Sequence, residues 1–151
     1  MTKENLAQIC EQNIKDPSLQ PRVEGGVFTT YCNIAARRVA QLAGCTDFDA
    51  MPNANAMVAM MGGSDDWTTV NGQAASHIAQ SGGLVIAGKK YEGHGHVAVV
   101  YPADPQMSGS WGHQVPMVAN VGKNMGVMRS SQAFPVDMGE PTYYAWKEPV
   151  A

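Results

Sequence analysis

The sequence predicts an α+β fold in which helices pack on one face of a mostly antiparallel sheet. Helical periodicity of apolar residues dominates up to about residue 80, whereas short apolar runs with strand character follow from residue 84 onward. These runs succeed one another through short connections, which favours antiparallel pairing. With 151 residues, of which 44% are hydrophobic, the chain is long enough to fold as a single domain over residues 1–151.

The helices are expected in the first half of the chain. Residues 3–14 form a short amphipathic helix, and residues 19–29 an irregular loop around Gly25-Gly26. A clearer helix covers residues 30–43, because apolar residues recur there at helical spacing and Gly44 is placed like a C-terminal cap. Two further helices are predicted, one over residues 54–61 and one from Asn71 or Gly72 to about Gln80.

The second half is expected to supply the sheet. Five strands are predicted, at residues 84–87, 96–101, 116–121, 131–135 and 143–147. Composition also excludes some function classes. A net charge of −3 argues against a nucleic-acid partner, since such proteins are usually basic. No run of about 20 apolar residues predicts membrane insertion, and charged residues near the start predict that there is no signal peptide.

Cys32 is the first candidate for chemistry, because it falls in the first turn of the helix predicted over residues 30–43. The macrodipole and the free N–H groups of a helix N-terminus stabilise a thiolate. We therefore expect the thiol pKa to fall from about 8.5 towards neutrality, which makes a nucleophile. The alternative is a buried structural cysteine, because a free Cys packs as a small apolar residue.

The other two cysteines are interpreted as structural. Cys10 lies on the apolar face of the first helix, and Cys45 directly follows the glycine that ends the second. Three cysteines cannot all pair within one chain. A Cys10–Cys45 disulfide is the alternative arrangement.

His96 is the candidate general base, because it opens the apolar strand HVAVV. A strand-held imidazole can take the proton of a thiol and return it to a leaving amine. Alternation places His96, Ala98 and Val100 on one face, which we expect to pack against the helix that carries Cys32. His94 lies between two glycines and is held less firmly. The alternative for His96 is a hydrogen-bonded histidine at a strand edge.

A rival hypothesis uses zinc. His94 and His96 share a strand face if the strand extends back that far, and His113 would be a third ligand. Three protein ligands and a water are typical of catalytic zinc. The flanking glycines loosen this geometry, so the prediction is that the chain uses no metal and no other cofactor.

A third residue would orient the imidazole. Asn120 is the best-placed acceptor, because it is the polar residue midway along the apolar strand PMVANV, and a buried Asn needs hydrogen bonds. The alternative for Asn120 is a bulge or edge position before Gly122. Asp104 and His113 are weaker candidates for the orienting role.

A helix-borne cysteine followed by a strand-borne histidine resembles the papain-like arrangement of the small bacterial CHAP- and NlpC-type cell-wall peptidases. The stretch TTYCNIAARRVAQLAG resembles their nucleophile helix. The ordered segments PNANAMV, GGLVIAG, GHVAVVYP and YYAW resemble one branch, the first family of type VI secretion amidase effectors. The resemblance covers roughly residues 28–147.

This resemblance implies a papain-like fold and a Cys/His dyad that hydrolyses the γ-D-glutamyl–diaminopimelate bond of peptidoglycan stem peptides. Cys32 matches the nucleophile and His96 the general base. The family does not fix the third position as one residue type, so Asn120 rests on geometry. Asn33-Ile34 follows the nucleophile where many relatives have Ser-Gly, a departure that bears on the oxyanion region and on the substrate.

The resemblance also implies partners and a site of action. An exported antibacterial effector, made in the cytoplasm and acting in the periplasm or cell wall, would need a secretion apparatus and a cognate immunity protein. A phage lysin is the alternative delivery route. An N-acetylmuramoyl-L-alanine amidase with the same dyad and a non-catalytic cell-wall-binding domain are the alternative functions. We expect a monomer.

Overall fold

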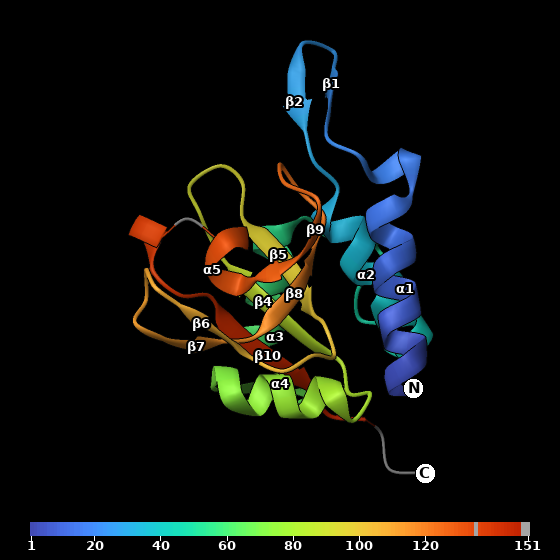
Figure 1. Cartoon of the computed structure of the whole chain (residues 1–151). Helices are drawn as coiled ribbons and strands as arrows, with labels where there is room; N and C mark the ends of the chain where they lie inside the picture. The colour runs from blue at the N-terminus through green and yellow to red at the C-terminus, as the bar shows by residue number, and fades with distance from the viewer. Residues whose placement is uncertain (135, 149–151) are drawn as a thin grey trace.

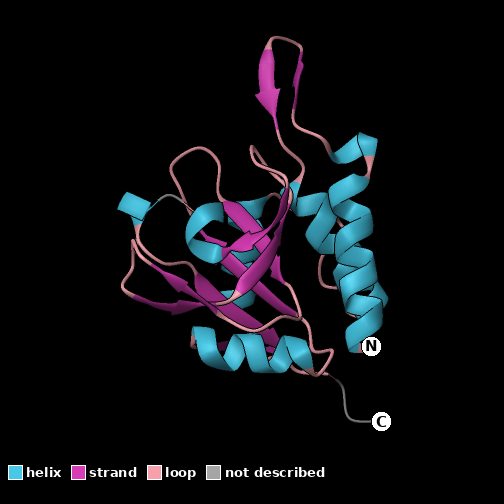
Figure 2. Ribbon diagram, in the orientation of Figure 1, coloured by secondary structure: helices cyan, strands magenta, loops and turns pink. Residues whose placement is uncertain are grey.

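The computed structural model describes residues 1–134 and 136–148, and it confirms the α+β class (Figures 1 and 2). Its centre is a six-stranded sheet with the order β3-β10-β4-β5-β8-β9, in which every neighbouring pair is antiparallel. The strands of this sheet are β3 (Trp67–Val70), β4 (Val85–Lys89), β5 (His96–Val100), β8 (Met117–Asn120), β9 (Gly126–Arg129) and β10 (Thr142–Trp146). Two separate hairpins pair β1 (Arg22–Glu24) with β2 (Val27–Thr29), and β6 (Gln106–Ser108) with β7 (His113–Val115).

Capping residues define the ends of several helices. They are α1 (Lys3–Lys15), α2 (Cys32–Ala43), α3 (Ala54–Gly63), α4 (Gly72–Gln80) and α5 (Ser130–Ala133), with short 3₁₀ turns η1 (Pro17–Leu19) and η2 (Val136–Met138). The side chains of Asn53 and Asn71 accept hydrogen bonds from backbone N–H groups in the first turns of α3 and α4. Gly44 ends α2 in the left-handed conformation, at φ 90°.

The register of the sheet shows which face carries α1, α2 and α3. Gly88 pairs with Val97, and a Cβ atom built on Gly88 would lie 2.8 Å from Val58 of α3. Side chains of a cross-strand pair share a face, so Val97 also faces the helices. Residues of α1 and α2 enclose a small interior space together with Val97 and Val99. The α1 and α2 helices lie side by side against this face (Figure 1).

Two regions differ from the sequence prediction. The stretch 19–29 is not an irregular loop, because its central Gly25-Gly26 turn, with φ 57° and 79°, joins two paired strands. The strand predicted at 131–135 is wrong over residues 131–134, where the last turn of α5 leads to Phe134; residue 135 lies outside the described residues. Strands β3, β6, β7 and β9 were not predicted at all.

The sheet is buried at its centre. Strands β4 and β5 are buried over almost their whole length. The α4 helix packs against β10 on the other face of the sheet, because a Cβ atom on Gly72 would lie 3.6 Å from Tyr143, whose strand partner Ala87 points away from α3. The prediction that the helices pack on one face is therefore wrong for α4. In the part of the chain that the structure describes, no helix has the length and apolar character needed to traverse a bilayer.

Candidate active site

Cys32 is the first residue of α2 and is 7% exposed. The preceding residue, Tyr31, occupies the N-cap position without a side-chain hydrogen bond to the helix. The first turn of α2 is therefore free of the side-chain cap that α3 and α4 carry. Backbone N–H groups at such a start are available to a negative charge that forms on the sulfur or beside it.

The pKa of the Cys32 thiol nevertheless lies above its ordinary value, which corrects the expectation from helix position. Burial disfavours the thiolate and raises the pKa; backbone N–H groups of Val97, Asn33 and Cys32 itself act in the opposite direction through hydrogen bonds. The desolvation of the sulfur outweighs these donors. Because Val97 follows His96 directly, its contact also brings the thiol beside the start of β5.

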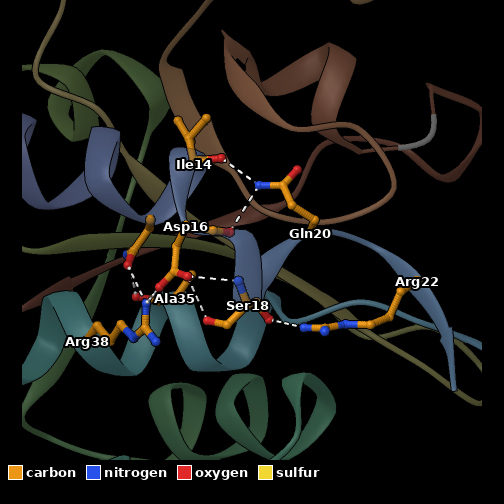
Figure 3. A network of polar contacts seen from close by, with 8 residues as sticks. Ile14, Asp16, Ser18, Gln20, Arg22, Ala35 and Arg38 are labelled. Atoms are coloured by element: carbon orange, nitrogen blue, oxygen red, sulfur yellow. Dashed lines mark hydrogen bonds and ion pairs between the residues drawn. The ribbon is translucent and has the colours of Figure 1, made fainter.

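A polar network fixes α2 to the segment that precedes it (Figure 3). Arg38 on α2 donates to Asp16 Oδ2 at 2.6 Å, and the N–H and Oγ–H of Ser18 donate to Asp16 Oδ1 at 2.8 and 2.7 Å. The hydrogen bonds from Arg38 and then Ser18 lower the pKa of Asp16 to about 2. Asn13 Nδ2 also donates to the carbonyl of Ala35 on α2. Hydrogen bonds at Ala35 and Arg38 thus hold α2 in addition to apolar packing.

His96 begins β5, and its ring is oriented by Asn120 at the end of β8. The distance from His96 Nε2 to Asn120 Oδ1 is 2.6 Å. Asn120 is 2% exposed, and its Nδ2 donates to the carbonyl oxygen of Asn124 at 2.6 Å. A carbonyl oxygen only accepts, so this second bond fixes which end of the Asn120 amide faces the histidine.

The orientation of this amide decides the tautomer of His96. Asn120 Oδ1 is an acceptor, so Nε2 must carry the hydrogen that it receives. In the neutral ring the other nitrogen, Nδ1, then has a free lone pair. No hydrogen bond occupies Nδ1 among the described residues. The imidazole is therefore held with a proton acceptor available.

Two neighbours that the sequence analysis did not identify complete the setting of the imidazole. Phe134, after α5, places its ring centroid 4.9 Å from that of His96 at an interplanar angle of 57°. A Cβ atom on Gly122 would lie 3.1 Å from His96 Cε1, so the absence of a side chain there makes room for the ring. Burial lowers the pKa of His96, and the hydrogen bond to Asn120 offsets part of this shift.

The prediction that the strand face of His96 packs against the helix that carries Cys32 is wrong. Val97 and Val99 face α2 and α3, so alternation directs His96, Ala98 and Val100 to the opposite face, where His96 meets Phe134. His96 is close to α2 for a different reason. It is the first residue of its strand, and the Cys32 sulfur lies against the backbone of the second residue, Val97.

The other two cysteines serve packing, and His94 lies outside the strand that carries His96. Cys10 and Cys45 are each 1% exposed and free, so the alternative Cys10–Cys45 disulfide is absent. Burial raises the pKa of Cys10 to about 12 and that of Cys45 to about 11. His94 lies in the exposed loop before β5.

The structure brings neither the alternative orienting residues to His96 nor the three predicted zinc ligands together. Asp104 accepts a hydrogen bond from Gln80, and His113 on β7 pairs with Glu140. Among residues 1–134 and 136–148, no group of three or more histidine, cysteine or carboxylate side chains is placed to hold one ion. The structure thus brings Asn120 to His96 and leaves Asp104 and His113 elsewhere.

A cleft of about 400 Å³ opens beside the thiol. Its walls are the β1–β2 hairpin, the start of α2 with Cys32 and Asn33, the start of α3, and the loop before β5. The lining residues are Val27, Phe28, Thr29, Thr30, Cys32, Asn33, Asn53, Ala54, Asn55, Gly93, His94 and Gly95. A larger hollow of about 540 Å³, near His113 and Glu140, has no cysteine in its lining.

These features together describe a thiol at a helix start, an oriented imidazole on the first residue of the strand whose second residue the thiol contacts, and an open cleft. Such an arrangement can perform nucleophilic attack on a carbonyl, with the imidazole moving the proton. In comparisons with known proteins, neither the models of protein families nor the curated sequences contain a match to this chain.

Proposed function

We propose that the chain is a papain-like cysteine peptidase that hydrolyses amide bonds in peptidoglycan stem peptides, at the γ-D-glutamyl–diaminopimelate bond. One observation carries the hydrolase part. Asn120 holds His96 with Nδ1 unoccupied, and the Cys32 sulfur lies against Val97, the next residue along the strand. The choice of substrate rests on the sequence resemblance of residues 28–147.

The proposed reaction begins with both groups neutral. Burial raises the pKa of Cys32 and lowers that of His96, so a resting thiol and imidazole are favoured over an ion pair. When substrate enters, the thiol proton passes to His96 Nδ1 while the sulfur bonds to the amide carbon. The N–H groups at the start of α2 stabilise the oxyanion, and one such donor typically contributes about 3–4 kcal/mol.

The intermediate then breaks down in two steps. The C–N bond cleaves as His96 returns the proton to the leaving amine, which leaves a thioester on Cys32. A water molecule gives one proton to His96 Nδ1 and adds its oxygen to the acyl carbon. Cleavage of the C–S bond releases the carboxylic acid, and the proton on His96 restores the thiol. Asn120 keeps the ring in the tautomer that both steps require.

Peptidoglycan lies outside the cytoplasm, so the proposal includes action in the periplasm or cell wall after dedicated export. A producing cell with the same polymer would be exposed to the enzyme. The proposal therefore also includes a secretion apparatus and a cognate immunity protein as partners.

Mass spectrometry of purified muropeptides tests the proposal. We expect the wild-type protein to release products that end at the γ-D-glutamyl residue, and Cys32→Ala to release none. Circular dichroism of the variant should match the wild type, because a Cys-to-Ala change at a helix start removes one sulfur atom.

Three other results would each overturn the endopeptidase assignment. Separation of the peptide from the muramoyl group would identify an N-acetylmuramoyl-L-alanine amidase. Intact muropeptides together with protein bound to cell-wall sacculi would identify a non-catalytic binding domain. Equal cleavage by Cys32→Ala would exclude the thiol mechanism.

A further inference from the structure

The β1–β2 hairpin projects away from the body of the molecule (Figure 1), and it pairs with no other strand that the structure describes. Each of its two strands therefore has one edge without a partner strand. Tyr31 holds the hairpin, because its ring lies 4.9 Å from the Arg22 guanidinium carbon and its hydroxyl donates to Glu24 Oε1 at 2.6 Å. Tyr31 directly precedes Cys32, so the hairpin stands at the start of the helix that carries the thiol.

The part of the hairpin that lines the cleft is β2 together with the residue that follows it. Four consecutive residues, 27–30, line the cleft, whereas none of residues 22–24 of β1 does. Register pairs Val23 with Phe28 and Glu24 with Val27, so the side chains of Val27 and Phe28 point to opposite faces of the hairpin. A wall that includes residues of both faces of β2, but no residue of β1, is the outer edge of β2. The backbone of this strand is therefore turned towards the cleft.

The turn of the hairpin decides which backbone groups this edge presents. Both residues of Gly25-Gly26 have positive φ, as in a two-residue type I′ connection. The residues that flank such a turn, here Glu24 and Val27, form a hydrogen-bonded pair. Hydrogen-bonded and non-hydrogen-bonded pairs alternate along an antiparallel ladder, so the next pair, Val23 and Phe28, directs its N–H and C=O groups outward. Outside the strand ladders, no backbone hydrogen bond involves Phe28 among residues 1–134 and 136–148.

A free strand edge beside a nucleophile can hold a peptide. An extended residue alongside Phe28 accepts a hydrogen bond from its N–H and donates one to its C=O, as a strand does when it is added to the edge of a sheet. Such a contact uses only the backbone of the ligand. Charged groups on both sides of a scissile amide are therefore compatible with it.

The other hydrogen-bonding groups of the cleft are committed to the fold to a greater extent. The side chains of Asn33, Asn53 and Asn55 each form a hydrogen bond with a backbone group of the protein. The outward N–H and C=O of Phe28 have no such backbone partner among the described residues. They lie in the wall of the same cleft as Cys32, which places a pair of backbone groups for a peptide beside the proposed nucleophile.

We propose that the outer edge of β2 holds the stem peptide, with the backbone N–H and C=O of Phe28 bonded to one extended, α-linked residue of the substrate near the scissile amide. The inference rests on the proposed hydrolase function of Cys32. It adds the way in which the substrate is recognised, namely through its backbone, as a short third strand beside the hairpin.

The kinetic test compares Phe28→Pro with Phe28→Leu. Both variants lose the aromatic ring, but only proline removes the outward N–H, and a strand edge whose N–H faces away from the ladder tolerates proline. On a defined muropeptide we expect KM of Phe28→Pro to be about tenfold that of Phe28→Leu, as for the loss of one hydrogen bond, with kcat values within about twofold of each other.

Val23→Pro is the matched control, because it removes the corresponding N–H from the edge of β1, which does not line the cleft. We expect its KM to stay within about twofold of the wild type, since the ladder keeps its hydrogen-bonded pairs. Equal KM values in Phe28→Pro and Phe28→Leu, or equal losses in the two proline variants, would overturn the proposal.

Hydrogen exchange gives a second readout that leaves the hairpin sequence unaltered. The Cys32→Ala variant is saturated with an intact muropeptide, and the exchange of single amides is followed by NMR with and without this ligand. We expect the exchange of the Phe28 amide to slow at least about tenfold, because its N–H gains an acceptor, and that of the Val23 amide to stay unchanged. Unchanged exchange at Phe28 in the saturated protein would overturn the binding edge.

The two measurements separate the failures. Protection of the Phe28 amide without muropeptide cleavage by the wild type would reject the hydrolase function and support the binding edge. Normal cleavage, with no protection of Phe28 and equal KM values in Phe28→Pro and Phe28→Leu, would reject the binding edge alone. Absence of both binding and cleavage would reject the two together.

Discussion

At the scale of single residues, the candidate site depends on two hydrogen bonds of one buried amide. Asn120 accepts a hydrogen bond from His96 and donates one to the Asn124 carbonyl. The tautomer of the imidazole is therefore decided by a backbone oxygen that lies two hydrogen bonds away. His94 has no comparable support. It lies in the loop before β5, whereas His96 belongs to the strand ladder, in which it pairs with Lys89.

The two histidines should therefore differ sharply in activity assays. His96→Ala is expected to remove essentially all muropeptide turnover, because the proton acceptor is lost. His94→Ala is expected to lower kcat/KM at most about tenfold, or about 1.4 kcal/mol of barrier. Steady-state kinetics on one defined muropeptide compares them. An inactive His94→Ala beside a nearly normal His96→Ala would contradict the assignment of the base.

The raised pKa of Cys32 gives the direction of a pH profile. A thiol whose pKa lies above its ordinary value has less thiolate at neutral pH. We expect alkylation by iodoacetamide to accelerate with rising pH, with a midpoint above about 8.5, the free-thiol value. Mass spectrometry of the alkylated protein locates the label. Cys32→Ser should remain unlabelled under native conditions, because Cys10 and Cys45 are buried. A midpoint below the free-thiol value would contradict this direction.

The residue types of the site could be identified from the sequence, but their surroundings could not. A cysteine at a helix start, a histidine at a strand start and an Asn within an apolar strand each stand out against local patterns. Burial cannot be recognised from such local patterns. For Cys32 it reverses the pKa shift that helix position alone predicts. Phe134 and Gly122 reach His96 through tertiary packing, and no local pattern marks them.

At the scale of elements, the loop that leads into β5 is closed by a side chain of α3. Asn55 Nδ2 donates to the carbonyl of Tyr91 at 3.0 Å, and the Tyr91 N–H donates to Asn55 Oδ1 at 3.3 Å. A Cβ atom on Gly95 would lie 2.2 Å from the same Oδ1. The Asn55 amide is thus wedged between the two ends of the loop, directly before His96.

Removal of this clamp should affect both turnover and folding stability. We expect Asn55→Ala to lower kcat/KM about tenfold and the free energy of unfolding by about 1–2 kcal/mol. Asn71→Ala is the control, because it removes the cap of α4, away from the cleft, at a cost of about 1 kcal/mol. Kinetics and urea unfolding of both variants are compared. Similar kcat/KM values in the two variants would show that the clamp does not position His96.

The sequence correctly predicted helices and strands where the segments were long or had clear capping residues. The helices α1 to α4 and the strands β4, β5, β8 and β10 lie near their predicted places, because apolar periodicity and the caps at Asn53, Asn71 and Gly44 define them. The three-residue strands of the two hairpins are too short for alternation to be read. The error at 131–134 has a similar cause, since α5 is a single turn.

At the scale of the whole molecule, folded stability is linked to the protonation of His96. Burial lowers its folded-state pKa below the unfolded value of about 6.5, so its contribution is present above that pH and is lost as pH falls. His113 acts in the opposite sense, because the Gln114 carbonyl and Glu140 raise its pKa. A variant comparison is needed to separate the two.

Urea unfolding of wild type and His96→Gln at pH 7.5 and 5.5 makes that comparison. Gln does not titrate, and His113 is present in both proteins. We expect the stability of the wild type relative to His96→Gln to be greater at pH 7.5 than at pH 5.5. An equal difference at both pH values would show that His96 is not held neutral by the fold.

The strand order has a consequence for how the chain is made. Strand β10 lies between β3 and β4, so both of these strands keep a bare edge until Thr142–Trp146 is available. On the ribosome, the helices and the β4–β5 hairpin emerge first. The six-stranded sheet is completed only when residues 142–146 leave the exit tunnel. Pairing across so long a stretch of sequence is slow compared with local contacts. A nascent chain therefore holds Cys32 and His96 long before it has the finished sheet that supports them.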